Sequence, residues 1–183
     1  MPDASHMSSA LTLPEGVVRI NAVLGSTTGT DSEYIELFGA PGTSLDGLSL
    51  VVVESDDQAS NGAIDRRIDL TAADTIGANG FFLLANGLAE ATYGVTADKT
   101  IANNTIENSS YTLALVETVT LTGSAVAGTE VVRDAVGVTD GEGPGFFALG
   151  APVVGPDGSF LPAGVRRNDD GVDTEHRVGF QPA

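Results

Sequence analysis

The stretch DSEYIELF, residues 31–38, carries three acids around a core of Tyr34, Ile35 and Leu37. Successive side chains of an extended strand point to opposite faces, so residues 33, 35 and 37 share one face and residues 34, 36 and 38 share the other. The stretch therefore predicts a β-strand, and neither of its faces is purely polar.

The two-residue period of the strand places Glu33 and Glu36 on opposite faces. Glu33 lies at the strand start and is expected to reach water past the sheet edge. Glu36 lies between two aromatic residues, where an unpaired charge would cost several kcal/mol; we expect a structural ion pair with Arg19 or Arg133. Catalysis by two carboxylates would need both acids on one side of a cleft about 5 to 10 Å across. Opposite faces therefore argue against a paired-acid hydrolase.

Short runs rich in β-forming residues continue along the chain, separated by clusters of Gly, Asp, Asn and Pro. They predict strands at residues 17–24, 33–38, 48–54, 66–70, 80–86, 111–117, 119–123 and 131–138. A brief run at residues 88–95 is the one helix candidate. Eight short strands without intervening helices indicate an all-β fold, an antiparallel β-sandwich in which hairpins rather than parallel crossovers join neighbours.

The composition of the chain changes after Val138, where Gly and Pro recur too often for regular β-ladders. Residues 139–164 are interpreted as a long loop that lies on the sandwich, pinned by Phe146, Phe147 and Phe160. A disordered linker is the alternative, although three Phe are unusual for one.

Composition narrows the classes of function. The 183 residues hold 25 acids and 8 bases, a formal net charge of -17, which makes nucleic acid and anionic membrane poor partners and divalent cations better ones. No run of about 18 apolar residues occurs, so membrane insertion is not expected. The absence of cysteine removes disulfides and thiolate chemistry.

The start of the chain contains SHM at residues 5–7, which is typical of a cloning junction. Residues 1–16 are therefore interpreted as a tag and a disordered leader, and residues 17–183 as a single domain of a size that holds one core.

Two acid-rich loops have a composition that suits calcium, which prefers six to eight oxygen ligands. They predict candidate ligands at Asp31, in the loop 29–33, and at Asp169, Asp170 and Asp173, in the loop 168–175. The spacing departs from that of an EF-hand. Ordinary turn chemistry of Asp-Gly and Asp-Thr pairs is the alternative.

Signals for catalysis are sparse. His6 falls in the tag, which leaves His176 as the general-base imidazole, and neither a Gly-x-Ser-x-Gly elbow nor a phosphate-binding loop with its lysine occurs. We expect no enzyme activity. A hydrolase with an atypical site at His176 and the acids of residues 169–175 stays as an alternative.

Several segments together resemble the lamin tail domain family, which occurs in nuclear lamins and in bacterial secreted or surface proteins. They are VRINAV (18–23), SEYIELF (32–38), LDGLSL (45–50), NGFFLLANG (79–87), DAVG (134–137) and RRNDDGVDTEHRVGF (166–180). The chain departs from the family pattern at Ala22, Gly39 and Leu48. The resemblance implies an immunoglobulin-like sandwich, an extracellular or cell-surface location, and no catalytic residues.

These observations predict a non-catalytic interaction or structural module of a secreted or surface-associated bacterial protein, with a protein or polysaccharide partner. A calcium-dependent carbohydrate-binding module is the main alternative. Its exposed aromatic candidates are Tyr34, Tyr93, Phe146 and Phe147, and the lack of tryptophan counts against it.

Overall fold

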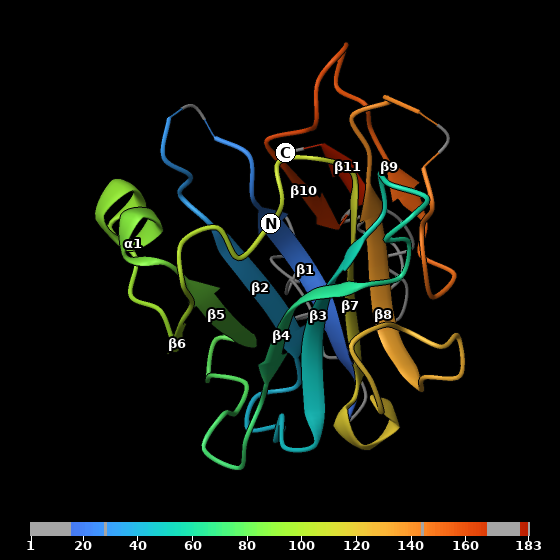
Figure 1. The fold of residues 1–183 in the computed structure, drawn as a ribbon. Coiled ribbons are helices and arrows are strands. Elements are labelled where there is room, and N and C mark those ends of the chain that lie inside the picture. The colour runs from blue at the N-terminus through green and yellow to red at the C-terminus, as the bar shows by residue number, and fades with distance from the viewer. Residues whose placement is uncertain (1–15, 28, 144, 168–179, 183) are drawn as a thin grey trace, which may run out of the picture.

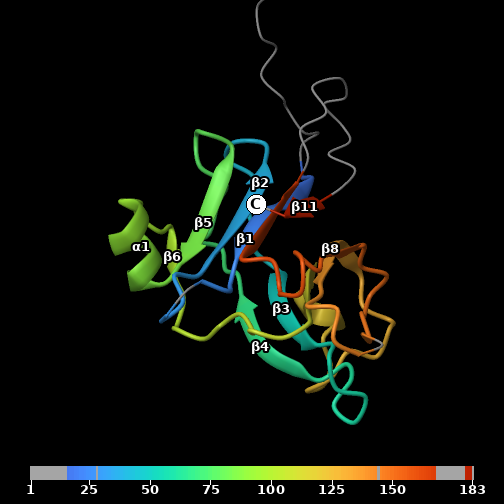
Figure 2. The same cartoon turned by 90° about the horizontal axis from the view of Figure 1, so that it is seen from above.

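Two β-sheets face each other in this protein, as seen in the computed structural model, which describes residues 16–27, 29–143, 145–167 and 180–182 (Figures 1 and 2). The six-stranded sheet has the order β11-β10-β1-β2-β5-β6 and the five-stranded sheet the order β4-β3-β7-β8-β9. The first comprises β1 (Val18–Leu24), β2 (Tyr34–Gly39), β5 (Phe81–Ala85), β6 (Lys99–Thr100), β10 (Gly164–Arg167) and β11 (Phe180–Pro182). The second comprises β3 (Leu48–Glu54), β4 (Ile64–Asp69), β7 (Tyr111–Glu117), β8 (Val132–Val138) and β9 (Val153–Val154). The predicted all-β sandwich is confirmed.

Most strand pairs are antiparallel, and two short pairs at the sheet edges, β5 with β6 and β8 with β9, are parallel. A parallel pair needs a connection that returns the chain to its starting end. Helix α1 (Gly87–Tyr93) forms part of the connection from β5 to β6. The side chain of Asn86 caps the helix by accepting a hydrogen bond from the amide of Ala89, and Gly94 ends the helix at φ 66°. No helix in the described ranges is long and apolar enough to cross a membrane.

The main core lies between the two sheets and is built from alternate residues of their facing strands. Its fully buried large side chains include Ile20, Ile35, Leu37, Leu84, Leu50, Leu113 and Leu115. A second cluster, which includes Val51, Val53, Ala114 and Val116, lies on the other face of the five-stranded sheet. Both faces of β3 and β7 are thus buried, which explains why LSLVVVE and YTLALVE read as continuous apolar runs.

The segment after Val138 covers that second cluster. Ala148, Leu149 and Ala151 pack against it, and the Phe147 ring lies so close to β8 that a Cβ at Gly137 would be 2.6 Å from its Cδ1. The prediction that the segment lies on the sandwich is confirmed. Two parts of it are wrong: Phe160 is 76% exposed and pins nothing, and the segment forms the ladder of β9.

The strands expected at residues 17–24, 33–38, 48–54, 66–70, 80–86, 111–117 and 131–138 are present within two residues at each end. The strand expected at 119–123 is wrong: residues Thr118–Thr120 form a 3₁₀ turn instead. The hydroxyl of Thr120 donates to the carbonyl of Glu117 (2.7 Å) and so favours a tight turn over an extended chain. Strands β6, β9, β10 and β11 were not expected, because they are short or depend on a distant partner. The immunoglobulin-like topology stays a prediction.

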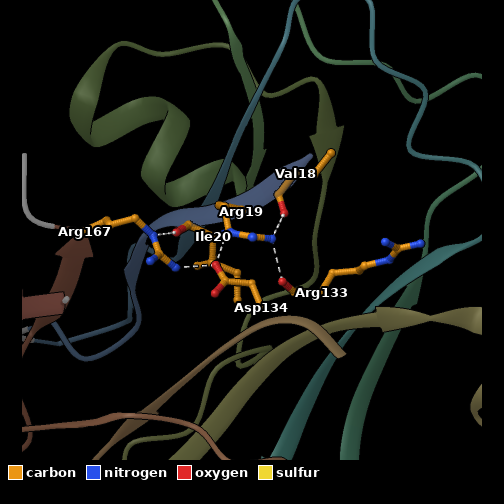
Figure 3. Close-up of polar contacts among 6 residues, drawn as sticks. All are labelled: Val18, Arg19, Ile20, Arg133, Asp134 and Arg167. Carbon is orange, nitrogen blue, oxygen red and sulfur yellow. Dashed lines mark hydrogen bonds and ion pairs between the residues drawn. The ribbon is translucent and has the colours of Figure 1, made fainter. Parts of the chain in front are cut away.

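A polar cluster ties the sheets together near one end (Figure 3). Asp134 of β8 accepts hydrogen bonds from the amide of Ile20 in β1 (2.7 Å) and from the guanidinium of Arg167 in β10. Arg167 also donates to the carbonyl of Ile20 (2.9 Å). Burial raises the pKa of Asp134 above its ordinary value, and the Arg167 guanidinium opposes that rise. One strand from each sheet is therefore joined through a largely buried ion pair.

Candidate functional site

Three carboxylates from distant parts of the chain, Glu54, Asp65 and Glu107, lie together in a pocket of about 510 Å³, here called the carboxylate pocket. One oxygen from each lies within 4.8 Å of the others. Glu54 ends β3 and Asp65 lies in β4. In the β3–β4 ladder Val52 pairs with Arg66 and Val53 with Ile64, so Asp65 is the extra residue of a β-bulge. A bulge redirects a side chain, and here it accompanies the approach of Asp65 to Glu54.

Glu107 reaches the pocket because its loop is held by Glu33. The carboxylate of Glu33 accepts from the amide of Ile106 (2.7 Å), the amide of Thr105 (3.2 Å) and the side-chain amide of Asn86 (3.2 Å). Glu33 is fully buried, so the expectation that it reaches water is wrong. Its side chain shares the inward face with Ile35, and the amides of residues 105 and 106 solvate the charge in place of water.

The electrostatics of the carboxylate pocket disfavour three negative charges at once. Burial, with the charges of Asp65 and Glu54, raises the pKa of Glu107 to about 7. Burial also raises the pKa of Glu54. One oxygen of Asp65, Oδ2, is inaccessible to solvent and has no hydrogen-bond partner among the described residues. Chemically, such a group can share a proton near neutral pH or contribute oxygen ligands to a cation.

Asp31, one of the acids expected to bind calcium, lies outside the carboxylate pocket. Asp31 is buried; its Oδ1 accepts from the amide of Thr27 (2.8 Å) and its Oδ2 from the side chain of Asn108 (2.8 Å). It thus ties two loops together and is not one of the three clustered carboxylates. Asp169, Asp170, Asp173 and His176 fall outside the described residues. Calcium at these positions stays a prediction.

The ion pair expected for Glu36 is wrong. Glu36 accepts a hydrogen bond from the side chain of Asn21 (2.5 Å), while Arg19 donates to the carbonyl of Arg133 (2.7 Å) and Arg133 pairs with Glu117 (2.5 Å). The reason is a register shift between Ile20 and Ala22 in the β1–β2 ladder. The shift places Asn21 as an extra residue of β1, next to Glu36 on the neighbouring strand.

A second hollow, here called the tyrosine pocket, opens beside helix α1 and has a volume of about 360 Å³. Its lining residues are Leu24, Tyr34, Glu36, Leu83, Tyr93 and Val95. The first four alternate along β1, β2 and β5 with the core residues Val23, Ile35 and Leu84, so they lie on the outer face of the six-stranded sheet. Tyr93 is the last residue of α1 and Val95 follows the helix, which lies next to β5 and β6 (Figures 1 and 2).

The two tyrosine rings meet edge to face, with centroids 6.4 Å apart and planes at 86°. Tyr93 is 49% exposed and Val95 is 38% exposed. Burial, with the nearby Glu36 charge and Tyr93, raises the pKa of the Tyr34 hydroxyl, so that hydroxyl stays protonated and can donate a hydrogen bond. The pocket therefore offers aromatic surface, aliphatic walls and one carboxylate to a ligand.

Of the four aromatic residues singled out from the sequence, Tyr34 and Tyr93 come together in this pocket, whereas Phe146 and Phe147 belong to the segment over the five-stranded sheet. The carboxylate pocket was missed. Its members come from two strands and a loop, and no spacing within the sequence links residues 54, 65 and 107. Comparisons of this chain with protein-family models, with curated proteins and with solved structures gave no match.

Proposed function

We propose that this chain is a non-catalytic interaction module that binds its partner through the tyrosine pocket. The observation that carries the proposal is the convergence of Tyr34 and Tyr93 on the outer face of the six-stranded sheet, with Tyr93 half exposed. Aromatic side chains with a polar end supply much of the binding energy of protein and ligand sites. An apolar hollow with a single carboxylate is suited to recognition, since it holds no paired acid and base for a reaction.

The module is further proposed to be of the lamin tail type and to work outside the cell or at its surface. Support for the family comes from β1, β2, β3 and β5, which overlap four of the segments that carry the resemblance. Support for the setting comes from the formal charge of -17, because an acidic shell keeps a protein dispersed in a salty medium. Localisation is tested by looking for the natural gene product in culture supernatant and cell-surface fractions; retention in the cytoplasm contradicts it.

Binding at the pocket is tested by isothermal titration of the 183-residue chain with panels of peptides and neutral oligosaccharides. At least one ligand is expected to give saturable heat that is lost in Tyr93→Ala. The matched control is Val119→Ala, an exposed residue of the 3₁₀ turn that does not line the pocket. Heat that survives Tyr93→Ala contradicts the proposal.

Two alternatives are separated by simple comparisons. The calcium-dependent carbohydrate-binding module predicts oligosaccharide heat that disappears on chelation with EDTA. The hydrolase predicts turnover that disappears in His176→Ala, whereas the interaction module predicts no difference between native chain and variant in a broad hydrolase screen.

A further inference from the structure

The tyrosine pocket has an electrostatic character that narrows the chemistry of its ligand. We propose that it takes the side chain of a lysine presented by a partner protein, with the ammonium group held by Glu36 and the tyrosine rings. This inference rests on the proposed function and adds the partner's chemistry to it.

Charge favours a cation in the tyrosine pocket. Glu36 is the one charged side chain among the lining residues, and it accepts a hydrogen bond from the neutral side chain of Asn21. Two further acids lie close by: Asp98 accepts from the amide of Leu83 (2.8 Å), and Glu90 of α1 accepts from the amide of Ala97 (2.9 Å). A cation is attracted to this side of the sheet, and an anion is repelled.

The two tyrosine rings of the pocket stand nearly at right angles. Because their planes stand at 86°, Tyr34 and Tyr93 do not form a flat platform for a sugar ring. Perpendicular aromatic walls instead suit a compact cation, which is attracted to a ring face by the ring quadrupole. The pocket also lies at the carbonyl end of α1, whose last turn holds no basic residue, and that end of a helix favours positive charge.

The apolar walls of the pocket fit the alkyl chain of a lysine. Leu24, Leu83 and Val95 line the pocket and offer apolar contact to the four methylenes of a lysine, which commonly pack on such surface while the ammonium stays solvated or paired. A volume of about 360 Å³ lies at the small end of ligand pockets, which span about 300 to 1,000 Å³. One side chain, rather than a large ligand, matches it.

Two basic residues of the six-stranded sheet, Lys99 and Arg166, bear on how a lysine could reach the site. The chain's one lysine, Lys99, is bound to Asp74 at 2.9 Å, so a second copy of this chain offers no free lysine. Arg166 lies on the same sheet face as Glu36, because both pair with Ala22 from opposite sides; this places it two strands away, at roughly 10 Å. The incoming lysine therefore approaches from the α1 side, away from Arg166.

The test uses a seven-residue peptide with one central lysine, acetyl-Gly-Ser-Gly-Lys-Gly-Ser-Gly-amide, and its twin with norleucine in place of lysine. The twin keeps the alkyl chain and removes the charge. Titration of the isotope-labelled 183-residue chain is followed by the NMR amide signals of Tyr34, Leu83 and Val95. The lysine peptide is expected to shift these signals saturably, and the norleucine peptide is expected to leave them in place.

Variants locate the interaction. Tyr93→Leu and Glu36→Gln are each expected to lower the affinity for the lysine peptide by about threefold or more. A loss of this size is typical of a single cation–π or charge contact. Asp46→Asn is the control: it removes one exposed negative charge that lies outside the pocket and is expected to leave the affinity unchanged. Glu36→Gln keeps the tyrosine pair, so it stands as a second test if Tyr93→Leu perturbs the fold.

Three results would overturn the inference. Equal shifts with the norleucine peptide would mean that the charge of the lysine is not recognised. An equal loss of affinity for the lysine peptide in Asp46→Asn would mean that the peptide is attracted to the acidic protein as a whole. If cellohexaose shifts the three signals and the lysine peptide does not, the proposal that the ligand is a lysine is overturned, and the pocket remains an interaction site. If neither these probes nor the peptide and oligosaccharide panels move the signals, the proposed function fails as well.

Discussion

Glu33 shows how one buried acid organises the loops around it. It is fully buried, and its carboxylate accepts from two backbone amides of the loop before β7 and from the side chain of Asn86. Asn86 in turn caps α1. A charged acceptor with several donors replaces much of the hydration that burial removes. Glu36, three residues on, is partly exposed and accepts from Asn21.

Glu33→Ala is expected to destabilise the protein by about 3 kcal/mol, because it leaves three donors buried without an acceptor. Glu36→Ala is the control and is expected to cost less than about 1 kcal/mol. Urea unfolding followed by circular dichroism measures both. A loss below about 1 kcal/mol for Glu33→Ala would show that the loop does not depend on this carboxylate.

The β3–β4 hairpin and the loop before β7 meet at the carboxylate pocket. The bulge at Asp65 and the Glu33 contacts bring like charges together, and burial, with those charges, raises the pKa of Glu107 to about 7. A carboxyl whose pKa is 4.5 unfolded and higher when folded keeps its proton only in the folded state between these two values. Stability is therefore present at low pH and is lost as the pH rises through the folded pKa.

Glu107→Gln is expected to flatten that pH dependence. The urea midpoint of the native chain should fall between about pH 5 and about pH 8 more steeply than the midpoint of the variant, and the variant should be the more stable of the two at the upper end. Asp46→Asn, which removes an exposed carboxylate elsewhere, should keep the native slope. Parallel curves for Glu107→Gln and the native chain would place the titration on another group.

The contact between β8 and the segment over the second core cluster leaves little room for a side chain at Gly137. A Cβ at Gly137 would be 2.6 Å from the Phe147 ring, whereas a Cβ at Gly87, in the first turn of α1, would meet nothing within 4 Å. Gly137→Ala is therefore expected to cost about 1 to 3 kcal/mol through overpacking. Gly87→Ala is expected to be neutral or stabilising. Thermal unfolding compares them, and equal melting temperatures would mean that the Phe147 segment moves freely away from β8.

For the whole molecule, the two sheets are held by the apolar core and by the ion pair of Asp134 with Arg167, which links β8 to β10 and β1 (Figure 3). The two side chains are 13% and 8% exposed. A pair this well shielded from water contrasts with Arg67 and Asp69 on the edge strand β4, whose side chains are 34% and 53% exposed.

Arg167→Met is expected to lower the free energy of unfolding by about 3 kcal/mol, because it leaves the buried Asp134 carboxylate without its cation. Arg67→Met, the exposed counterpart, is expected to change it by less than about 1 kcal/mol. Urea unfolding of both variants measures the difference. Similar small losses in the two variants would show that the sheets are held by apolar contacts alone.

Local sequence was sufficient for much of the fold, because strand formation follows a two-residue rhythm that is readable within six or seven positions. The runs at residues 48–54 and 111–117 match β3 and β7 residue for residue. Strands of two to four residues, such as β6, β9 and β10, carry no such rhythm; each exists because a longer neighbouring strand offers unpaired backbone groups.

The composition and the alternating pattern of the amino-acid sequence are enough to predict an acidic all-β sandwich and to name Tyr34, Tyr93, Phe146 and Phe147 as candidate binding residues. Three other features arise only in the folded chain: Glu33 is buried, Asn21 rather than an arginine meets Glu36, and residues 54, 65 and 107 share a pocket. Burial and charge pairing depend on atoms brought together from distant parts of the chain. Register shifts of one residue, at Asn21 and at Asp65, redirect side chains in ways that the alternating pattern does not encode.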